Sequence, residues 1–586
     1  MTSTAAADAG SFIDEAFAAY GIADEHSEAA RAEAAAWREQ DGIDDPALTD
    51  LTPLPFVTID NEDSRDLDQA LHICRDGDDY RIRYALADAS YYVRAGSALF
   101  DEALARGSSY YAPDRVAPML PRALSEDLVS LEPDKLRRAL VFDIRLNQDG
   151  ETLSTQIVQA RIRSRAQLSY HGVQAWYDDS AAATPNAMDV VDVVDVVDAV
   201  DTVDTVDAVD AVDAVDAKDT SWIESLNLLF DIGRKLNRLG RRRGVVTFDR
   251  READVAVEGQ PGRFVARRRA RLEVEQWNAE VSLLCNQEGA SMLAALDAIP
   301  PESGLEPIYR VHDAPLAGRL RTLRKQLDAW VDLHGFETPG KGKQSHWRWR
   351  TEQTLADYID TITATADNAV DRGRVRAIQR QVLVLQRASE FRAEPGRHHA
   401  LAVDGYARFS SPMREVVGIY THKELLEALK GSGTTDTALR DSVIESANAA
   451  RRRQKSLDKD IGFKVINDLL SSDLESDSAP LHRGTVLGVK GHGRSARSRA
   501  YLYIGIEDLA LDLKVYAEDL VRRYASVYAF TEFTAVADDP RKPTFVLGDA
   551  VDIRTVGFDE ERSRFKLDLA LRGEAARRER QRARPA

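Results

Sequence analysis

Hydrophobic and polar positions along the chain follow different periods in different regions. Near the start, several apolar residues recur at helical spacing, and Ser27 can cap a second, Ala- and Glu-rich helix that runs towards Trp37. The residues on the first helical face are Phe12, Ile13, Ala16, Phe17 and Tyr20. We therefore expect residues 1–50 to form a short helical N-terminal segment.

The middle of the chain mixes strand-like and helix-like patterns. Short apolar runs at 55–59, 80–87 and 140–146 predict strands. From about residue 221 to 470 the helical period dominates, as in 221–239 and 273–296. This mixture predicts an α+β fold.

The last part of the chain returns to strands. Five short β-like runs occupy 484–489, 500–506, 511–517, 549–559 and 564–570. Five is the strand number of an OB-type barrel, which we expect over residues 480–572. A basic tail, residues 573–586, follows it.

Composition narrows the class of protein. Among the 586 residues, 44% are hydrophobic, which is enough for sizeable cores and argues against global disorder. There is no run of 18 apolar residues and no secretory signal pattern, so we expect no membrane association. The two cysteines exclude a disulfide framework and a four-cysteine zinc site. We expect a protein of the reducing cytoplasm.

The negative charge is concentrated in one repeat. From residue 189 to 219 an aspartate recurs at every third position, eleven in all, and the other 555 residues carry only −9 of the total of −19. A period of three fits neither a strand nor an amphipathic helix, so we interpret 179–220 as a low-complexity insertion in a surface loop. A calcium site is a weaker alternative, because the repeat lacks turn glycines. From Pro480 onwards the net charge is +4.

A second acidic cluster has a different character. Asp60, Asp66 and Asp68 lie within nine residues, directly after a buried-looking strand. Such carboxylates repel one another unless they are solvated or a hard divalent cation neutralises them. An EF-hand is excluded, since Arg65 and Leu71 stand where that loop needs Gly and Glu. Composition alone leaves a solvated turn and a metal site equally open.

The cluster lies in PFVTIDNEDSRDLDQAL, which resembles the opening motif of the RNB catalytic domain of ribonuclease II/R exoribonucleases. The resemblance covers roughly residues 53–475, with its motifs in family order, and predicts an RNB catalytic domain over 51–475. The further motifs are YALADASYYV (84–93), YYAPDRVAPMLPRALSEDLVSL (110–131), NAEVSLLCN (278–286), IYRVH (308–312) and RFSSPMRE (408–415). The C-terminal barrel resembles the S1 RNA-binding domain that follows RNB in this family.

The resemblance implies both a fold and an activity. The fold is a mixed sheet packed with helices, followed by the S1 domain; N-terminal cold-shock domains are not expected here. The activity is hydrolysis of single-stranded RNA from its 3′ end to nucleoside 5′-monophosphates, with Mg²⁺ as cofactor and Mn²⁺ as the alternative ion. We expect a monomer with no obligatory protein partner.

The resemblance also assigns the catalytic residues. Asp60, Asp66 and Asp68 match three of four acidic positions that bind metal and support catalysis, with Asp68 orienting the attacking water. At the fourth, Gln69 stands where many relatives have Asp; its carbonyl can coordinate Mg²⁺ but brings no charge. Arg414 matches the arginine that contacts the scissile phosphate and stabilises developing charge.

Further residues are expected to hold RNA. Tyr111 and Phe248 match aromatics that stack on terminal bases, Glu280 an acid at the terminal ribose, and Asp458 a family Glu. In the C-terminal region the candidates are Arg494, Arg497, Tyr501 and Tyr503, and basic runs at 241–243 and 263–271 supply further phosphate contacts. A core position for Phe248 and an exposed helix surface for Glu280 are the structural alternatives.

Two other functions stay open at this point. A catalytically weak or inactive RNB-fold RNA-binding protein is supported by Gln69 and opposed by the other four catalytic residues. A DNA exonuclease would require contacts to the ribose 2′-hydroxyl to be dispensable.

Overall fold

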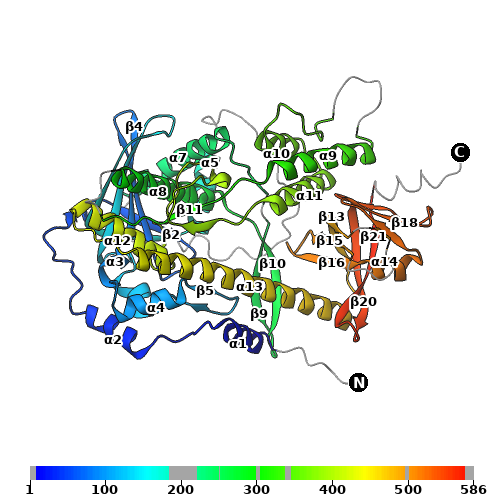
Figure 1. Ribbon diagram of the computed structural model, residues 1–586, viewed down its shortest axis with the longest axis horizontal. Helices are drawn as coiled ribbons and strands as arrows, with labels where there is room; N and C mark the ends of the chain where they lie inside the picture. Colours follow the sequence, from blue (N-terminus) through cyan, green and yellow to red (C-terminus); the bar gives the residue numbers. More distant parts are fainter. Residues whose placement is uncertain are drawn as a thin grey trace.

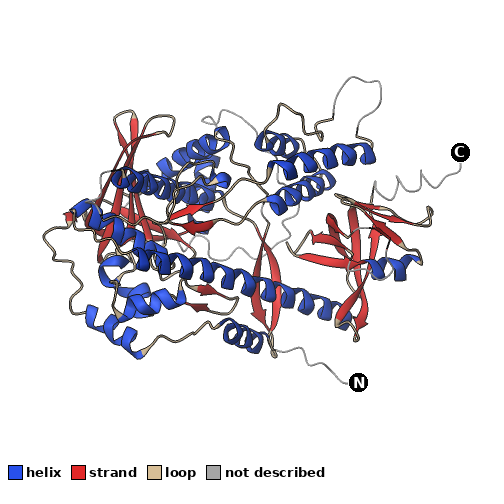
Figure 2. Ribbon diagram, in the orientation of Figure 1, coloured by secondary structure: helices blue, strands red, loops and turns tan. Residues whose placement is uncertain are grey.

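The computed structural model describes residues 8–183, 221–249, 251–298, 304–336, 345–491, 493–494 and 500–573. Most of the predicted Asp-rich insertion, Arg497 and the basic tail lie outside these residues. Helices and strands are interspersed throughout (Figure 2), which confirms the α+β fold. Figure 1 shows a large α+β part at one end, a smaller β part at the other, and the long helix α13 (Thr437–Glu475) running between them.

The N-terminal segment forms helices α1 (Ala9–Tyr20) and α2 (Glu28–Trp37), as predicted. The Ser27 hydroxyl accepts a hydrogen bond from Ala30 N at 3.2 Å and so caps α2. The apolar face of α1 packs beside α13 and strand β10 (Arg263–Arg269), where the rings of Phe12 and Phe264 lie 6.2 Å apart. The first helix is thus tied to elements far along the chain.

A six-stranded mixed sheet forms the centre of the large part. Its strand order is β1-β8-β2-β3-β4-β7, and β8 runs parallel to β1 and β2. The strands are β1 (Thr49–Asp50), β2 (Phe56–Asp60), β3 (Gln69–Asp76), β4 (Asp79–Ala87), β7 (Leu136–Leu146) and β8 (Thr152–Ser169). The predictions for β2, β4 and β7 are confirmed, whereas β3 and the 18-residue β8 were not predicted.

Alternation along the strands sends side chains into two cores. Phe56 of β2 joins one core, against α4 (Ala98–Arg106) and α12 (Val416–Lys430). Its neighbour Val57 joins the other, against α7 (Ile223–Arg242) and α8 (Glu273–Asp297). Because helices cover both faces of the sheet, the carboxyl end of β2 is held from both sides. Helices α7 and α8 confirm the predictions at 221–239 and 273–296.

Two further units connect the large part to the C-terminal end. One is an antiparallel hairpin, β9 (Glu252–Glu258) and β10 (Arg263–Arg269). The other is a helical core built from α9 (Ala317–His334), α10 (Leu355–Ala364) and α11 (Ala369–Leu385). Trp330 of α9 donates a hydrogen bond to Leu547 O at 2.7 Å, so this core also joins the C-terminal β domain.

The C-terminal β domain, residues 482–571, contains all five predicted strands in one antiparallel sheet of order β16-β15-β13-β20-β21. These are β13 (His482–Lys490), β15 (Tyr501–Ile506), β16 (Asp512–Tyr516), β20 (Ala550–Asp559) and β21 (Arg564–Leu571). Elements that were not predicted are helix α14 (Ala517–Tyr524) and a second sheet of β14 (Gly493–Arg494), β17 (Tyr528–Phe530), β18 (Thr534–Ala537) and β19 (Phe545–Val546). Side chains from both sheets share one core.

Within the described part of the chain, no helix combines the length and the apolar character needed to cross a bilayer.

Candidate active site

The acidic cluster sits at the carboxyl end of β2 and in the loop that leads to β3. Asp60 is the last residue of β2, opposite Ser169 of β8. The loop is pinned behind it: the Ser130 hydroxyl accepts from Leu67 N at 3.0 Å and donates to Arg65 O at 2.6 Å. Asp68 then ends the loop, with its carbonyl accepting from Ala87 N at 2.9 Å. The carboxylates therefore project from backbone held on a rigid sheet.

Arg414 reaches the same place from the segment that precedes α12. Its Nε donates to Asp68 Oδ2 at 2.6 Å and lies 3.4 Å from Asp66 Oδ2, while Nη2 lies 3.4 Å from Asp60 Oδ2. The backbone N–H of Met413 donates to the other oxygen of Asp68, Oδ1, at 2.9 Å. The four residues predicted to be catalytic are thus in contact, although Arg414 is about 350 positions away in the sequence.

Burial disfavours the ionised form of two carboxyl groups in this cluster. The Asp68 side chain is fully buried, which raises its pKa, and Arg414 opposes that rise. Burial also raises the pKa of Asp66 to about 6; Arg414 lowers it and the neighbouring Asp68 raises it further. With all three carboxylates ionised, Arg414 leaves two negative charges uncompensated among these four residues. Such a charge is costly to bury and matches one divalent cation.

The donor set fits a hard cation, because carboxylate oxygens are the ligands that Mg²⁺ and Mn²⁺ prefer. In the described residues, however, no three acidic, His or Cys side chains form a closed metal-ligand group, and Arg414 lies between the carboxylates. The residues that would hold the ion are Asp60, Asp66 and Asp68.

Gln69 has a different partner. Its Oε1 accepts a hydrogen bond from the hydroxyl of Tyr84, which is fully buried on the neighbouring strand β4. The amide therefore satisfies a buried tyrosine without adding a further charge to a crowded site. Its predicted role as a metal ligand stays a prediction.

A cavity of about 440 Å³ opens in front of the cluster, and Tyr111 lines it together with Asp60, Asp66 and Arg414. Burial near these charges raises the pKa of the Tyr111 hydroxyl to about 12. Gln454 of α13 holds Tyr111 in place: its Oε1 accepts from Tyr111 N at 3.0 Å, and its Nε2 donates to Tyr111 O at 3.1 Å.

Gln454 also contacts Asp458, because its Nε2 donates to Asp458 Oδ1 at 2.6 Å. The structure thus joins Asp458 to Tyr111, both predicted to bind RNA. Gln454 was not predicted, because an uncharged residue on a long helix gives no chemical signal of this kind.

A groove of about 980 Å³ lies between α13 and the C-terminal β domain, and we call it the α13 groove. Asp458, Tyr501 and Tyr503 line it, as does Phe463, which is 63% exposed and was not predicted. The ammonium of Lys514 lies 5.0 Å from the ring centre of Tyr501, and the Arg380 guanidinium 3.6 Å from that of Tyr503. Partly exposed aromatic rings beside cations are suited to stacking on bases next to phosphates.

Two predicted RNA-binding residues lie elsewhere. Phe248 is half-buried against the α9–α11 core. Glu280 lines a separate cavity of about 380 Å³ with Arg243 and Gln287, where burial raises its pKa and Arg243 lowers it. Among the described residues neither side chain lines the cavity of the acidic cluster. Of the predicted arginines in the C-terminal domain, Arg494 belongs to β14, opposite Ala529 of β17.

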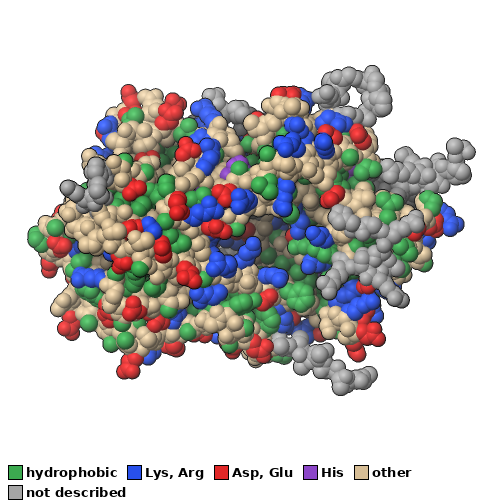
Figure 3. Space-filling view, viewed as in Figure 1, with side chains coloured by type: hydrophobic (Ala, Val, Ile, Leu, Met, Phe, Trp, Pro, Cys, Tyr) green, Lys and Arg blue, Asp and Glu red, His purple; other side chains and the backbone are tan. Residues whose placement is uncertain are grey.

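Basic side chains gather around a hollow near the centre of the face shown in Figure 3. In the predicted run 263–271, Arg263 pairs with Glu475 at 2.6 Å and Arg267 with Glu258 at 2.6 Å, so much of that run is structural. Arg268 of the same run instead lies near Arg251 and Arg376, and the acidic neighbours of this group are Glu507 and Asp249.

That group joins β9–β10 to α11. Burial lowers the pKa of Arg376 to about 10, with a further contribution from Arg251, and the pKa of Arg251 is lowered by burial and by Arg268. Glu507 offsets part of the repulsion among these guanidinium groups, since its Oε1 lies 3.9 Å from Arg376 Nη2. A phosphate would offset more of it, and its oxygens fit the fork geometry of arginine.

Comparison with known proteins identifies the class that this fold and site define. The model of the RNB domain family matches residues 48–431, so the chain belongs to the RNB-domain family. Ribonuclease R of Escherichia coli K12 is 27% identical over 541 residues, which cover 88% of this chain and 57% of that protein. The chain therefore spans a little over half the length of this curated relative.

Solved structures agree on the fold. Mycoplasma genitalium RNase R in complex with ribose methylated single-stranded RNA matches with a TM-score of 0.75 at 18% identity, over 96% of this chain and 78% of that one. Yeast Ssd1, described as a pseudonuclease, matches with a TM-score of 0.57 at 14% identity, over 87% of this chain and 53% of that one.

Proposed function

We propose that the protein is a Mg²⁺-dependent 3′-to-5′ exoribonuclease that hydrolyses single-stranded RNA to nucleoside 5′-monophosphates, with Mn²⁺ as an alternative ion. The observation that carries this proposal is the contact of Arg414 with Asp60, Asp66 and the buried Asp68, beside a cavity that Arg414, Asp60 and Asp66 line. A phosphodiester anion repels hydroxide, so its hydrolysis needs positive charge at the phosphate and an activated water. The cluster combines a guanidinium for the phosphate with carboxylates for a cation.

The chain's own groups divide the work. Asp60, Asp66 and Asp68 would hold the cation, which when bound neutralises phosphate charge and lowers the pKa of a coordinated water. In the structure the Arg414 guanidinium pairs with carboxylates, and phosphate oxygens can accept hydrogen bonds from it in the same geometry. When Arg414 turns to the phosphate, Asp68 Oδ2 becomes available, while the Met413 N–H keeps Oδ1 in place. Asp68 is then positioned to orient the attacking water.

RNA is proposed to approach along the α13 groove and to stack its terminal base on Tyr111. Base stacking is sequence-tolerant, which suits an enzyme that advances along any strand. The buried arginines around Arg376 supply positive potential for the backbone. Stacking by Phe248 and a ribose contact by Glu280 stay predictions.

The proposal includes the setting of the enzyme. We infer a monomer that needs no obligatory protein partner and works in a reducing cytoplasm. Cys74 and Cys285 are both free, which agrees with such a compartment.

The second candidate is an RNA-binding protein with little or no catalysis. Gln69 favours it, because an amide bonded to Tyr84 replaces a charged ligand. The likeness to a pseudonuclease also shows that the fold occurs without nuclease activity in Ssd1.

One assay separates the candidates. Single-stranded RNA with a free 3′ end is incubated with the protein and Mg²⁺, with EDTA and Asp68→Asn as controls. We expect mononucleotides from the wild type and none from the controls. Binding of RNA without any release of mononucleotides supports the second candidate instead. Equal rates on single-stranded DNA of the same sequence contradict the RNA assignment.

A further inference from the structure

A second cavity lies behind the loop that carries the acidic cluster. It has a volume of about 280 Å³ and is formed by that loop, the end of β8, helix α5 (Tyr170–Ala183) and the start of α7. Asn61, the residue after Asp60, lines both this cavity and the catalytic one. The two spaces are therefore neighbours across a single residue.

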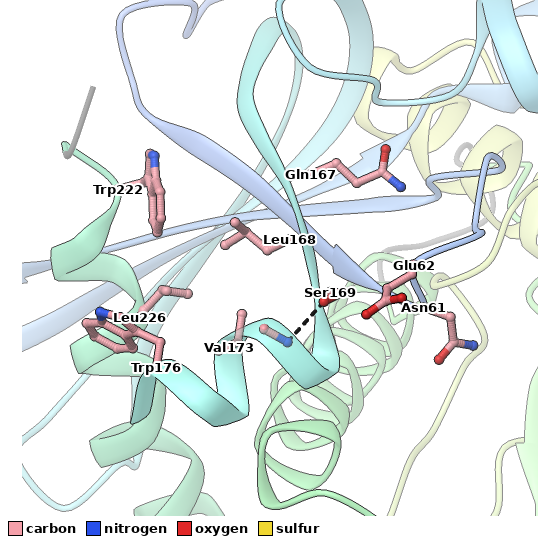
Figure 4. Close-up of a pocket in the computed structure, with 10 residues that line it drawn as sticks. Asn61, Glu62, Gln167, Leu168, Ser169, Val173, Trp176, Trp222 and Leu226 are labelled. Atoms are coloured by element: carbon pink, nitrogen blue, oxygen red, sulfur yellow. Dashed lines mark hydrogen bonds between the residues drawn. The ribbon is translucent and has the colours of Figure 1, made fainter. Parts of the chain in front are cut away.

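The lining of this side cavity is divided by polarity. Figure 4 shows Trp176, Trp222 and Leu226 at one side and Asn61 with Glu62 at the other, with Leu168 and Val173 between them. Flat indole rings and branched aliphatic side chains are typical of sites for planar ligands, and a few polar groups set the orientation of such a ligand.

Trp222 supplies a second, independent observation. The residue is only 8% exposed, and among the described residues no acceptor lies within hydrogen-bond distance of its Nε1–H. Fourteen buried side-chain atoms of the described residues lack a hydrogen-bond partner, and Trp222 Nε1 is the one among them whose residue lines this cavity. Each such atom requires an explanation. A ligand that carries a ring-nitrogen acceptor explains this one, whereas a purely aliphatic ligand does not.

We propose that the side cavity binds a purine nucleoside, with the base between the tryptophans and the ribose towards Glu62. A ring nitrogen of the base accepts from Trp222 Nε1–H, and the cis-hydroxyls of the ribose donate to the Glu62 carboxylate. The choice of a nucleoside among planar ligands rests on the proposed function, because that reaction releases nucleotides in the adjoining cavity.

Charge decides which part of a nucleotide is recognised. The polar end of the cavity offers an amide and a carboxylate, Asn61 and Glu62, and no cation lines it among the described residues. A phosphate gains nothing from such a lining. Adenosine therefore binds at least as tightly as AMP, and ribose 5-phosphate, which has no base, does not bind.

The test observes binding directly in the full-length chain. The seven tryptophans are labelled as 5-fluorotryptophan, and ¹⁹F NMR spectra are recorded during titration with adenosine, AMP and ribose 5-phosphate. We expect saturable shifts of two signals, assigned to Trp176 and Trp222 by single Trp→Phe variants, with adenosine and AMP only. Shifts caused by ribose 5-phosphate, binding of AMP but not adenosine, or no shift at millimolar adenosine each overturn the proposal.

Two variants locate the contacts. Trp222→Phe keeps a ring but removes the donor, and it weakens adenosine binding about tenfold. Glu62→Gln weakens it about threefold, while Trp37→Phe, in a different core, leaves it unchanged. Equal affinity in Trp222→Phe and wild type contradicts the proposed pose. Because the titration measures no hydrolysis, loss of the nucleoside site and failure of the exonuclease assay are separate results.

Discussion

The acidic cluster with Arg414 and the α13 groove differ in how firmly their residues are held. Asp68 is fully buried, and each of its carboxylate oxygens accepts a hydrogen bond, from Met413 N and Arg414 Nε. In the groove, Phe463 is 63% exposed and Tyr501 has a cation beside its ring. Hydrolysis needs charges at fixed positions, whereas movement along RNA of any sequence needs surfaces that tolerate many bases. Changes in the cluster should therefore lower the rate of chemistry, and changes in the groove should weaken RNA binding.

The largest expected effect is that of Asp68→Asn. The amide keeps the shape but removes the charge that holds the cation and orients water, so we expect kcat to fall by about 10³-fold or more. RNA affinity, measured by fluorescence anisotropy, should stay within about twofold. Asp63→Asn, on the same loop and exposed, is the matched control. Full activity of Asp68→Asn would place the chemistry elsewhere.

Arg414→Lys should come next, with a fall in kcat of about 10²-fold. Lysine keeps the charge but loses the planar fork that pairs with phosphate and, at present, with three carboxylates. Single-turnover kinetics measure the chemical step, and Arg65→Lys at the rim of the same cavity is the control. A change in KM alone would assign Arg414 to binding, and the contrast between the two regions would disappear.

In the groove, Phe463→Ala and Tyr501→Ala should each raise KM for long RNA about tenfold, since stacking contributes ~1–3 kcal/mol per base. We expect kcat on saturating RNA to stay within about twofold. Leu153→Ala is the control, because Leu153 is an exposed apolar residue that does not line the groove. A selective loss of kcat in either groove variant would show that the groove takes part in chemistry.

The raised pKa of Asp66 predicts a pH effect that is confined to the cluster. A cation binds the ionised carboxylate, so between pH 6 and pH 5 one proton must be displaced, and affinity for Mn²⁺ should fall by about tenfold per pH unit. Above pH 6 the curve should be flat, and Asp66→Asn should abolish the slope. Calorimetric titration without RNA measures this, and a slope that persists in Asp66→Asn assigns the proton to another group.

The same shift has a consequence for stability. The folded pKa of Asp66 lies above the usual value of 3.8, so its stabilising contribution is present below pH 4 and lost as pH rises through about 6. Asp66→Asn should therefore raise the melting temperature at pH 8 relative to wild type, and not at pH 4.

The smallest expected effect is that of deleting residues 189–219, which removes eleven aspartates. Both regions remain intact, so kcat should change by less than about threefold, and RNA affinity should rise at low salt because repulsion is removed. Binding measured at two ionic strengths tests this. Lost activity would show that the repeat supports the catalytic part directly.

The sequence predicted the cluster well for a physical reason. Three of its carboxylates lie in one β2–β3 loop, so local chain geometry already keeps them together, and Arg414 stands in a long motif. The local sequence around Gln454 and Phe463 does not indicate their roles. Gln454 contacts Tyr111, which lies 343 positions away, and Phe463 shares its groove with residues of the C-terminal β domain. Glu280 lies in the helix predicted at 273–296, whereas the cavity that its side chain lines depends on tertiary contacts.

The fold shows the same division. The strands β2, β4 and β7 contain runs of consecutive buried, mostly apolar residues and were predicted. Strand β8 is exposed or half-buried at most of its positions, and its pattern was too polar to distinguish from a loop. Its place in the sheet follows from pairing with β2 and β7, which only the tertiary structure supplies.

Helix α13 gives the two regions a fixed separation. Gln454 is hydrogen-bonded to Tyr111 at the cavity of the acidic cluster. Phe463, nine residues further along, lines the α13 groove. At 1.5 Å per residue this is about 14 Å along a continuous helix. On the proposed RNA path, this spacing sets the length of the shortest strand that can contact Tyr111 and Phe463 at the same time. A shorter RNA can contact only one of them.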